Sequence, residues 1–260
     1  MNNQKALVLG IFLLFLIAYP GVRMVSLYEN GIGKEKTTHT LLIEKDRMRT
    51  DIRDSETDMS IIFRGDKNLF WSIDHKEKSY MEITKEDVKK MKGKMEEGMK
   101  MMEEMMEDLP PEQRKRMEEV MKGKTPPKER KIAYKKVASG QKVNQWLCDK
   151  YEGYAGKEKV EEVWATDYPK IGIKPEEVKV LEEMGKFFSE MIKDAAAHFY
   201  RFGTEKKEGG FWGVPVRIIG YEKGKKEFTM EIKEVKKESF KPQIFELPKG
   251  YKKEKLEIEE

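Results

Sequence analysis

Residues 61–80 read IIFRGDKNLFWSIDHKEKSY, and this stretch decides the kind of fold that the chain can adopt. An apolar run, Ile61–Phe63, ends at Gly65 as a strand ends at a turn. Apolar residues then alternate in Leu69–Ile73, which is the period of a half-buried strand. The polar residues 74–77 separate this run from the next as a hairpin turn would. We therefore predict adjacent antiparallel strands, and the same short-strand pattern extends from Thr37 to Ile83.

Strand-like sequence returns in the second half of the chain. Residues 142–154 and 160–166 predict a strand pair, and residues 214–221 and 228–235 predict a closing hairpin. Strands and helices are segregated along the chain, so we predict an α+β domain with an antiparallel sheet and helices on one face. The strands on both sides of the central helical stretch need one another to form a sheet. Residues 22–251 are thus predicted to form a single domain, followed by a charged tail at 252–260.

Nine of the seventeen methionines lie between Met91 and Met121. Residues 84–87 offer a helix start with acidic side chains in the first turn. The methionines that follow recur at helical spacing and line one face, which Met101 and Met105 widen: Met91, Met95, Met99, Met102 and Met106. Leu109-Pro110 then breaks the helix, and residues 112–121 restart it. We predict a methionine-rich helical hairpin over residues 84–124 and a later amphipathic helix over residues 175–203.

The beginning of the chain predicts export. Lys5 precedes an uninterrupted apolar run, residues 6–19, that Pro20-Gly21 closes. This run is shorter than the roughly 20 residues that span a bilayer, which favours a cleaved signal peptide over a retained membrane anchor. Because no cysteine follows the run, a lipid-modified N-terminus is not expected. Residues 1–21 are predicted to be a signal peptide or an N-terminal membrane anchor of an exported, periplasmic protein, soluble after cleavage or tethered by this segment.

The composition argues against several classes of function. The chain has 52 Lys and Arg against 48 Asp and Glu, and the two signs are interspersed, so no basic stripe suggests nucleic acid. The single cysteine, Cys148, excludes a disulfide framework within the chain and is predicted to be buried. Its neighbours offer no cation that would activate it as a nucleophile. The pair Glu161-Glu162 is interpreted as part of a solvated face.

No metal or cofactor site is predicted. The three histidines, His39, His75 and His198, lie far apart and lack a second ligand at helical spacing, so we interpret them as surface or packed residues. Gly123-Lys124-Thr125 imitates the end of a phosphate loop, but Glu118 stands where the required glycine should be. We predict neither catalytic residues nor a bound cofactor.

The chain contains several short motifs in a characteristic order: Arg47-Met48-Arg49, residues 74–80 (DHKEKSY), 109–114 (LPPEQR), 143–151 (VNQWLCDKY), 162–167 (EVWATD) and 245–251 (FELPKGY). Together they resemble the DUF4412 family, an exported family of undefined function that is similar to the periplasmic lipoprotein-carrier superfamily. The resemblance runs from about Thr37 to Tyr251. It implies a strongly curved antiparallel half-barrel whose concave face is covered by helices, including the methionine hairpin. In the carrier relatives this shape holds acyl chains, and the resemblance implies no catalytic residues.

The methionine face has three interpretations. Apolar stripes at helical spacing usually pack as core. Alternatively, the hairpin is a movable lid over an apolar cavity, because methionine is flexible and re-packs around variable partners. A Cu(I) site is the third interpretation, since thioethers suit this ion, but no His or Cys joins the cluster.

Our hypothesis is a non-enzymatic, exported protein that holds a lipid or another hydrophobic ligand at the cell envelope, near the membrane. The predicted ligand-binding residues are Met95, Met99, Met102, Met106, Phe188, Met191 and Phe199. The alternative is a structural or interaction protein. Its methionine hairpin would bind a partner as a helix binds in a groove, and the possible partners are other envelope proteins. An enzyme is the third and least favoured hypothesis.

Overall fold

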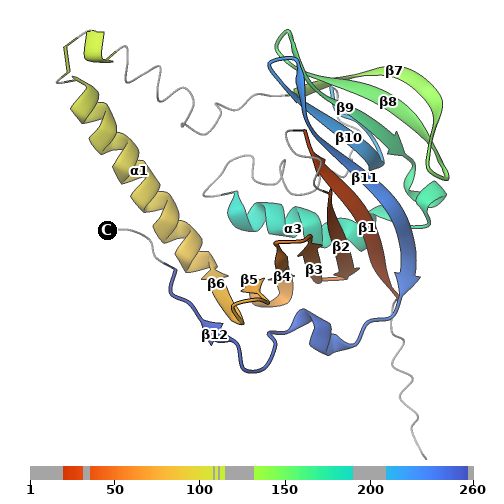
Figure 1. Cartoon of the computed structure of the whole chain (residues 1–260), viewed down its shortest axis with the longest axis horizontal. Helices are drawn as coiled ribbons and strands as arrows, with labels where there is room; N and C mark the ends of the chain where they lie inside the picture. The colour runs from red at the N-terminus through yellow and green to blue at the C-terminus, as the bar shows by residue number, and fades with distance from the viewer. Residues whose placement is uncertain are drawn as a thin grey trace, which may run out of the picture.

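One large sheet dominates the protein, which we describe from a computed structural model over residues 20–31, 36–107, 109–110, 112–114, 132–189 and 209–256. Its strands lie in the order β12-β6-β5-β4-β3-β2-β1-β11-β10-β9-β8-β7. Neighbouring strands are antiparallel except β12 and β6, which run parallel. The sheet is open, because β12 and β7 form its two ends (Figure 1). The predicted antiparallel sheet is confirmed.

The strands and helices have the following bounds. The strands are β1 (Gly21–Asn30), β2 (Lys36–Glu44), β3 (Arg47–Arg53), β4 (Asp58–Arg64), β5 (Leu69–Asp74), β6 (Ser79–Thr84), β7 (Ile132–Val143), β8 (Trp146–Ala155), β9 (Glu158–Thr166), β10 (Val214–Glu222), β11 (Lys225–Glu238) and β12 (Lys252–Lys253). The helices of the described residues are α1 (Lys85–Glu107), α3 (Lys179–Phe188) and the short 3₁₀ helices Gly65–Lys67, Tyr168–Ile171, Pro175–Val178 and Pro242–Phe245. Strands therefore predominate over helices among the described residues.

The turns confirm the predicted hairpins. The Asp74 carboxylate accepts hydrogen bonds from the backbone N–H groups of Lys76 and Glu77, at 2.8 and 3.0 Å, and so fixes the turn between β5 and β6. At the β10–β11 turn, Lys223 and Gly224 both have positive φ, 49° and 75°. Two successive residues with positive φ are what a tight two-residue hairpin requires.

The sequence analysis missed two strands. β1 lies near the middle of the sheet, between β2 and β11, although no strand was predicted before Thr37. β7 is the edge strand beside β8, and the predicted strand 142–154 joined the end of β7 to β8. The break between them is a turn in which Asn144 has a φ of 52°, a left-handed conformation that asparagine tolerates. The predicted helix 175–203 is α3 and its preceding 3₁₀ turn as far as residue 189, beyond which it lies outside the described residues.

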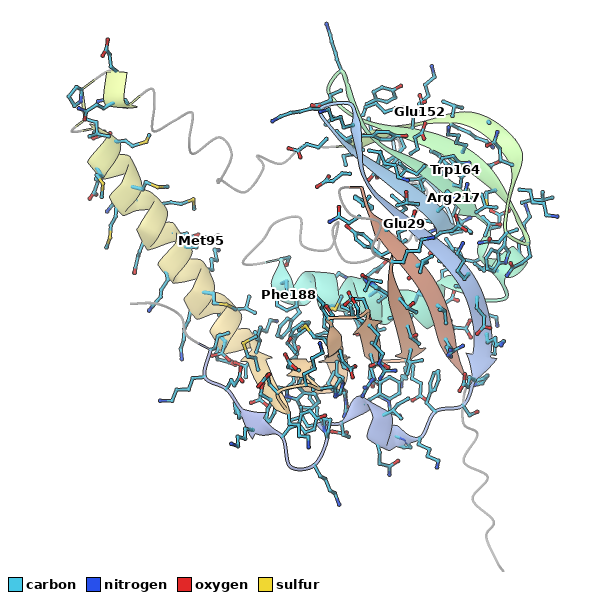
Figure 2. The ribbon with its side chains drawn as sticks, in the orientation of Figure 1. Glu29, Met95, Glu152, Trp164, Phe188 and Arg217 are labelled. Atoms are coloured by element: carbon cyan, nitrogen blue, oxygen red, sulfur yellow. The ribbon has the colours of Figure 1, made fainter. Side chains whose placement is uncertain are left out.

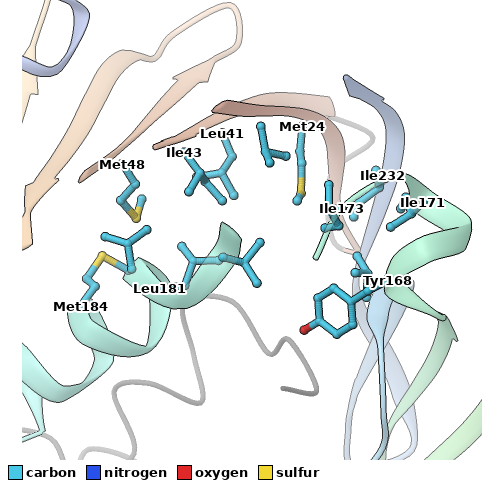
Figure 3. Close-up of a cluster of buried hydrophobic side chains, with 14 of the residues drawn as sticks. Met24, Leu41, Ile43, Met48, Tyr168, Ile171, Ile173, Leu181, Met184 and Ile232 are labelled. Carbon is cyan, nitrogen blue, oxygen red and sulfur yellow. The ribbon is translucent and has the colours of Figure 1, made fainter. Parts of the chain in front are cut away.

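The main core lies between the sheet and α3. Alternate residues of β1 and β2, such as Met24, Leu41 and Ile43, point to the same face and are buried. Leu181 and Met184 of α3 pack against this face, as Figure 3 shows for this cluster. The α3 rings extend the packing to the neighbouring strands, because Phe187 meets Phe63 edge-on with ring centroids 5.5 Å apart. This core holds α3 across the strands in Figure 1.

The C-terminal segment covers the opposite face of β2–β6. Ile62, Trp71 and Ile73 point away from α3 and form a second buried cluster with Phe245. The Arg47 guanidinium lies 4.9 Å from the centre of the Phe245 ring. Arg64, itself buried, bonds the Glu246 carboxylate, and its pKa is raised first by the hydrogen bond that it donates to Asp66. Both faces of this half of the sheet are therefore covered.

A polar chain of hydrogen bonds joins the same segment to the sheet. The Ser60 hydroxyl bonds Asp51 and His75, each at 2.6 Å, and the other nitrogen of His75 lies 2.9 Å from the Tyr251 hydroxyl. Ser60 has one proton to donate, so with Asp51 as its acceptor the His75 Nε2 donates to Ser60 and Nδ1 accepts from Tyr251. Ser60 is fully buried and Asp51 bonds the serine rather than the histidine. The chain is thus a structural link and not the arrangement of a hydrolytic triad.

We expect Phe245→Ala to lower the free energy of unfolding by about 3–5 kcal/mol, because it leaves a cavity against Ile62, Trp71 and Ile73. Urea unfolding measures the change. Phe240→Ala is the matched control, since Phe240 is only half-buried at the rim of the same cluster and should cost less. Equal losses for the two variants would show that the C-terminal segment does not close this core.

Candidate functional site

Helix α1 begins directly after β6 and has a well-formed start. The Thr84 hydroxyl donates to the Asp87 carboxylate at 2.7 Å, and the backbone N–H of Asp87 donates back to the Thr84 hydroxyl at 3.2 Å. The backbone N–H of Thr84 bonds the same carboxylate at 2.9 Å. This reciprocal capping confirms the helix start predicted at residues 84–87.

The methionine face of α1, defined as Met95, Met99, Met102 and Met106, continues a face that is buried at the start of the helix. Val88 is 1% exposed, and Met91 packs at the rim of the main core. Beyond this point α1 projects away from the sheet, as Figure 1 shows, and Figure 2 places Met95 on the projecting part. Met95 and Met99 are 37% and 39% exposed, and Met102 and Met106 are half-buried.

The flanks of the methionine face are more exposed than the face itself. Met101 and Met105 are 65% and 59% exposed. With 3.6 residues per turn, these two side chains lie well round the helix from the direction of Val88, whereas the methionine face lies close to it. The projecting part of α1 thus has a wide apolar band that is partly exposed to solvent. This band continues the side of the helix that is buried in the core at Val88.

The far end of α1 is closed by Arg114. Its guanidinium donates to the carbonyl oxygens of Met106 and Glu107, at 2.9 and 2.7 Å. These are carbonyls that the last turn of a helix leaves without an internal partner. The predicted break at Leu109-Pro110 is observed, and residues 112–114 are helical again. The rest of the predicted hairpin, from residue 115, lies outside the described residues.

The other predicted ligand-binding residues divide in two groups. Phe188 is 5% exposed at the end of α3, and its ring meets Phe70 edge-on at a centroid distance of 5.0 Å. It belongs to the main core, the buried cluster that also contains Val88, and Figure 2 shows it at the end of α3. Met191 and Phe199 lie outside the described residues.

A protein-family model described as a domain of unknown function, DUF4412, matches residues 113–251, which is more than half of the chain. The chain belongs to the DUF4412 family. No curated protein matches the sequence. The matched region begins directly after α1, and it is narrower than the resemblance from Thr37 that the motifs suggested.

Solved structures similar to this DUF4412 member share little sequence with it. An uncharacterized conserved protein from Thermus thermophilus has 7% identity and a TM-score of 0.46, with 91% of this chain and 90% of that one covered. PNGF-II has 8% identity and a TM-score of 0.38 over 90% of this chain and 31% of its own. The LolA superfamily protein NE2245 from Nitrosomonas europaea has 8% identity and a TM-score of 0.31, with coverages of 86% and 88%.

An aromatic stack, defined as Phe228, Tyr28 and His39, crosses the sheet and was not predicted. The Tyr28 ring lies 5.6 Å from Phe228 and 5.8 Å from His39, both nearly parallel to it at 18°. Alternation along β1 puts Tyr28 on the face that Met24 buries against α3. Burial lowers the pKa of His39, which favours a neutral ring in the stack. The DUF4412 member thus has half-buried rings on the α3 side of the sheet.

The other face of strands β8–β11 has a network of paired charges. Trp164 lies between two cations, with Lys150 Nζ 4.7 Å and Arg217 Cζ 5.6 Å from its ring (Figure 2). Glu162 bonds Lys150 at 3.0 Å. Burial alone would raise the pKa of Glu162, but hydrogen bonds from Lys150, Lys159 and Tyr221 outweigh it and lower the pKa. Lys150 and Arg217 thus each pair with a carboxylate on a neighbouring strand, Glu162 and Glu231 respectively.

The interpretation of Glu161-Glu162 as a solvated face is wrong. Both residues are 8% exposed, because β8 and β10 flank β9 on each side. Glu161 accepts a hydrogen bond from the Tyr134 hydroxyl, and Gly153 leaves the space between them. In contrast, the predicted burial of Cys148 is confirmed, and burial raises the pKa of its thiol to about 11. A thiol with this pKa is a poor nucleophile near neutral pH.

The described residues offer neither a cluster of metal ligands nor a membrane-spanning helix. No group of three or more His, Cys, Asp or Glu side chains among them is arranged to hold a metal ion. Neither α1 nor α3 is long and apolar enough to cross a membrane. His39 and His75 are packed residues, as predicted, and His198 lies outside the described residues.

We expect Gly93→Ala to strengthen α1, because a β-carbon at Gly93 would meet no atom within 4 Å and alanine favours a helix by about 0.5–1 kcal/mol over glycine. Hydrogen exchange of α1 amides should slow about two- to fivefold. Gly153→Ala is the matched control with the opposite sign. Its β-carbon would come within 2.8–3.0 Å of Glu161, Ile132 and Tyr134, so this variant should unfold at a lower temperature. Faster hydrogen exchange in Gly93→Ala would show that the added methyl group clashes with a neighbour, contrary to the open space around Gly93.

Proposed function

We propose that this DUF4412 member is an exported, non-enzymatic binding protein that holds a lipid or another hydrophobic ligand at the cell envelope. The observation that carries the proposal is the methionine face of α1. It extends a face that is core at Val88 into solvent, with Met95 and Met99 more than a third exposed. Each Å² of apolar surface that a ligand removes from water contributes roughly 25 cal/mol of favourable free energy to binding.

The side-chain chemistry of the face suits a ligand of variable shape. Methionine is unbranched and polarizable, so its side chains can follow an acyl chain that changes in length or unsaturation. A rigid core would favour leucine and isoleucine at these positions. The ligand-binding residues that we propose are Met95, Met99, Met102 and Met106, with Phe188, Met191 and Phe199 from α3 and the chain that follows it.

The sheet offers a second contact surface for the same ligand. We propose that the sheet curves into a half-barrel whose concave face is the α3 side, with the methionine helix as a movable lid. The aromatic stack of Phe228, Tyr28 and His39 lies on this side of the sheet and is only half-buried. Its flat rings would contact the ligand opposite the methionines.

The site of action follows from the beginning of the chain. Residues 6–19 are uninterrupted apolar sequence behind Lys5, which supports export to the periplasm and work close to the membrane. The strand β1 starts at Gly21, two residues after this segment.

A second candidate function uses the same face differently. The projection of α1 away from the sheet in Figure 1 also suits a helix that docks in the groove of a partner protein. In that case the protein is a structural or interaction module, and no lipid should accompany it.

Native mass spectrometry of the exported protein, purified without detergent and followed by organic extraction, tests the proposal. We expect discrete added masses that extract as lipid. A protein mass without adducts that stays unchanged after incubation with phospholipid vesicles would contradict the ligand hypothesis and favour the docking function.

Substitution of the methionine face sharpens this test. We expect Met99→Gln combined with Met102→Gln to reduce lipid adducts at least tenfold, because two amide groups would have to be desolvated against the ligand. Met101→Gln combined with Met105→Gln is the matched control, since these side chains lie on the flank and are the most exposed methionines of α1. Circular dichroism should give the same helix content for both variants. Equal adducts in the two variants would place the ligand elsewhere.

A further inference from the structure

Tyr168 is a buried tyrosine whose hydroxyl lacks a hydrogen-bond partner. It begins the 3₁₀ helix Tyr168–Ile171, which follows β9, and it is 1% exposed. Two buried side-chain oxygens among the described residues have no partner, Tyr168 Oη and Thr229 Oγ1. Thr229 is only half-buried, whereas Tyr168 is buried as a whole. Because an unpaired buried hydroxyl costs free energy, phenylalanine would suit this position better unless the hydroxyl is used.

The side chains around Tyr168 are apolar. Tyr168 belongs to the main core, and the backbone N–H of Ile173 donates to its carbonyl oxygen at 3.1 Å. Figure 3 shows the Tyr168 hydroxyl at the end of the ring that lies nearer to α3, on the side of Leu181. A buried water molecule needs two to four polar partners, which isoleucine and leucine side chains do not offer. A ligand with apolar surface of its own therefore suits this place better than a lone water molecule.

Trp212 packs against Tyr168. The two rings meet edge-on, with their centroids 5.5 Å apart. Trp212 is half-buried, so its indole forms part of the cover over Tyr168. The next residue fixes the position of this segment, because a β-carbon at Gly213 would lie 2.3 Å from the carbonyl oxygen of Thr166. The indole is thus placed to report a ligand that reaches the Tyr168 ring.

The electrostatics at Tyr168 favour an uncharged acceptor. Burial raises the pKa of the Tyr168 phenol, and the Glu182 carboxylate of α3 raises it further. The phenol therefore stays protonated at neutral pH and can donate its proton to a hydrogen bond. The Glu182 carboxylate would also repel a carboxylate or phosphate brought to the hydroxyl. An ester carbonyl oxygen accepts a hydrogen bond without bringing a charge into the core.

We propose that the Tyr168 hydroxyl donates a hydrogen bond to the carbonyl oxygen of an esterified acyl chain and so selects esters over free fatty acids. The inference rests on the proposed function and adds the chemical class of its ligand. Tyr168 lies near the start of α3 and Phe188 at its end, and the 10 residues of α3 span about 15 Å. A ligand held by its carbonyl at Tyr168 would extend its apolar chain along α3, toward Phe188 and the methionine face.

Three probes with matched chains test the selection: methyl decanoate, the decanoate anion and undecane. Binding to the delipidated protein is followed by tryptophan emission, and Trp212→Phe identifies the signal of the indole beside Tyr168. We expect the wild type to bind the ester about two- to tenfold more tightly than the alkane, which is the net value of one hydrogen bond. The anion should bind no more tightly than the alkane.

Tyr168→Phe removes the hydroxyl and keeps the ring. The affinity for the ester should fall about two- to tenfold, to that of the alkane, and the affinity for the alkane should not change. Without ligand, this variant should unfold at the same temperature as wild type or at a higher one, because an unpaired buried hydroxyl is lost. Tyr221→Phe is the matched control, since the Tyr221 hydroxyl donates to Glu162 at 2.9 Å. It should unfold at a lower temperature and keep the preference for the ester.

The outcomes separate this inference from the proposed function. Equal binding of ester and alkane by wild type, tighter binding of the anion than of the ester, or a preserved ester preference in Tyr168→Phe would overturn the inference. The binding function would still stand, because the probes bind. A clearly lower unfolding temperature of unliganded Tyr168→Phe would also overturn the inference, since the hydroxyl would then have a partner in the folded chain. If no probe binds, the ligand function is refuted and the inference falls with it.

Discussion

Strands β2–β6 have large apolar side chains on both faces, and the rest of the molecule is arranged to cover them. Ile43 and Phe63 point to α3, whereas Ile62 and Trp71 point to the C-terminal segment. An uncovered sheet face of this kind would expose several side chains that are now almost completely buried. The chain therefore has to return across this half of the sheet twice, once as α3 and once as the C-terminal segment that contains Phe245.

This requirement explains why distant motifs belong together. The Arg47 guanidinium lies 4.9 Å from the centre of the Phe245 ring, and His75 bonds Tyr251, so the early strand motif and the DHKEKSY turn both contact the FELPKGY segment. Arg64 joins the same contact by bonding Glu246. Three motifs that are far apart in the sequence thus hold the C-terminal segment on the sheet.

The sequence predicted those elements whose signal is local. The hairpins of β4–β6 and β10–β11 follow from alternation and turn residues, and the methionine face follows from helical spacing. β1 could not be separated from the apolar run before it, and its burial depends on pairing with β11, more than 190 residues away. β7 lacks alternation because it is an edge strand with mostly exposed side chains. How much of the methionine face reaches solvent depends on how far α1 extends past the sheet, and no local pattern gives that length.

The position of β1 determines how close the sheet lies to the residues that precede it in the chain. Gly21 is already packed, because a β-carbon there would collide with the Phe240 ring and the backbone of Ile43. Pro20 is therefore the whole of the spacer between the apolar run and a strand near the middle of the sheet. If the proposed export segment, residues 6–19, were retained in a bilayer, Pro20 alone would separate it from β1, and the sheet would lie at the lipid surface with its orientation set by that strand. If the segment were removed, this constraint on the orientation of the sheet would be lost with it.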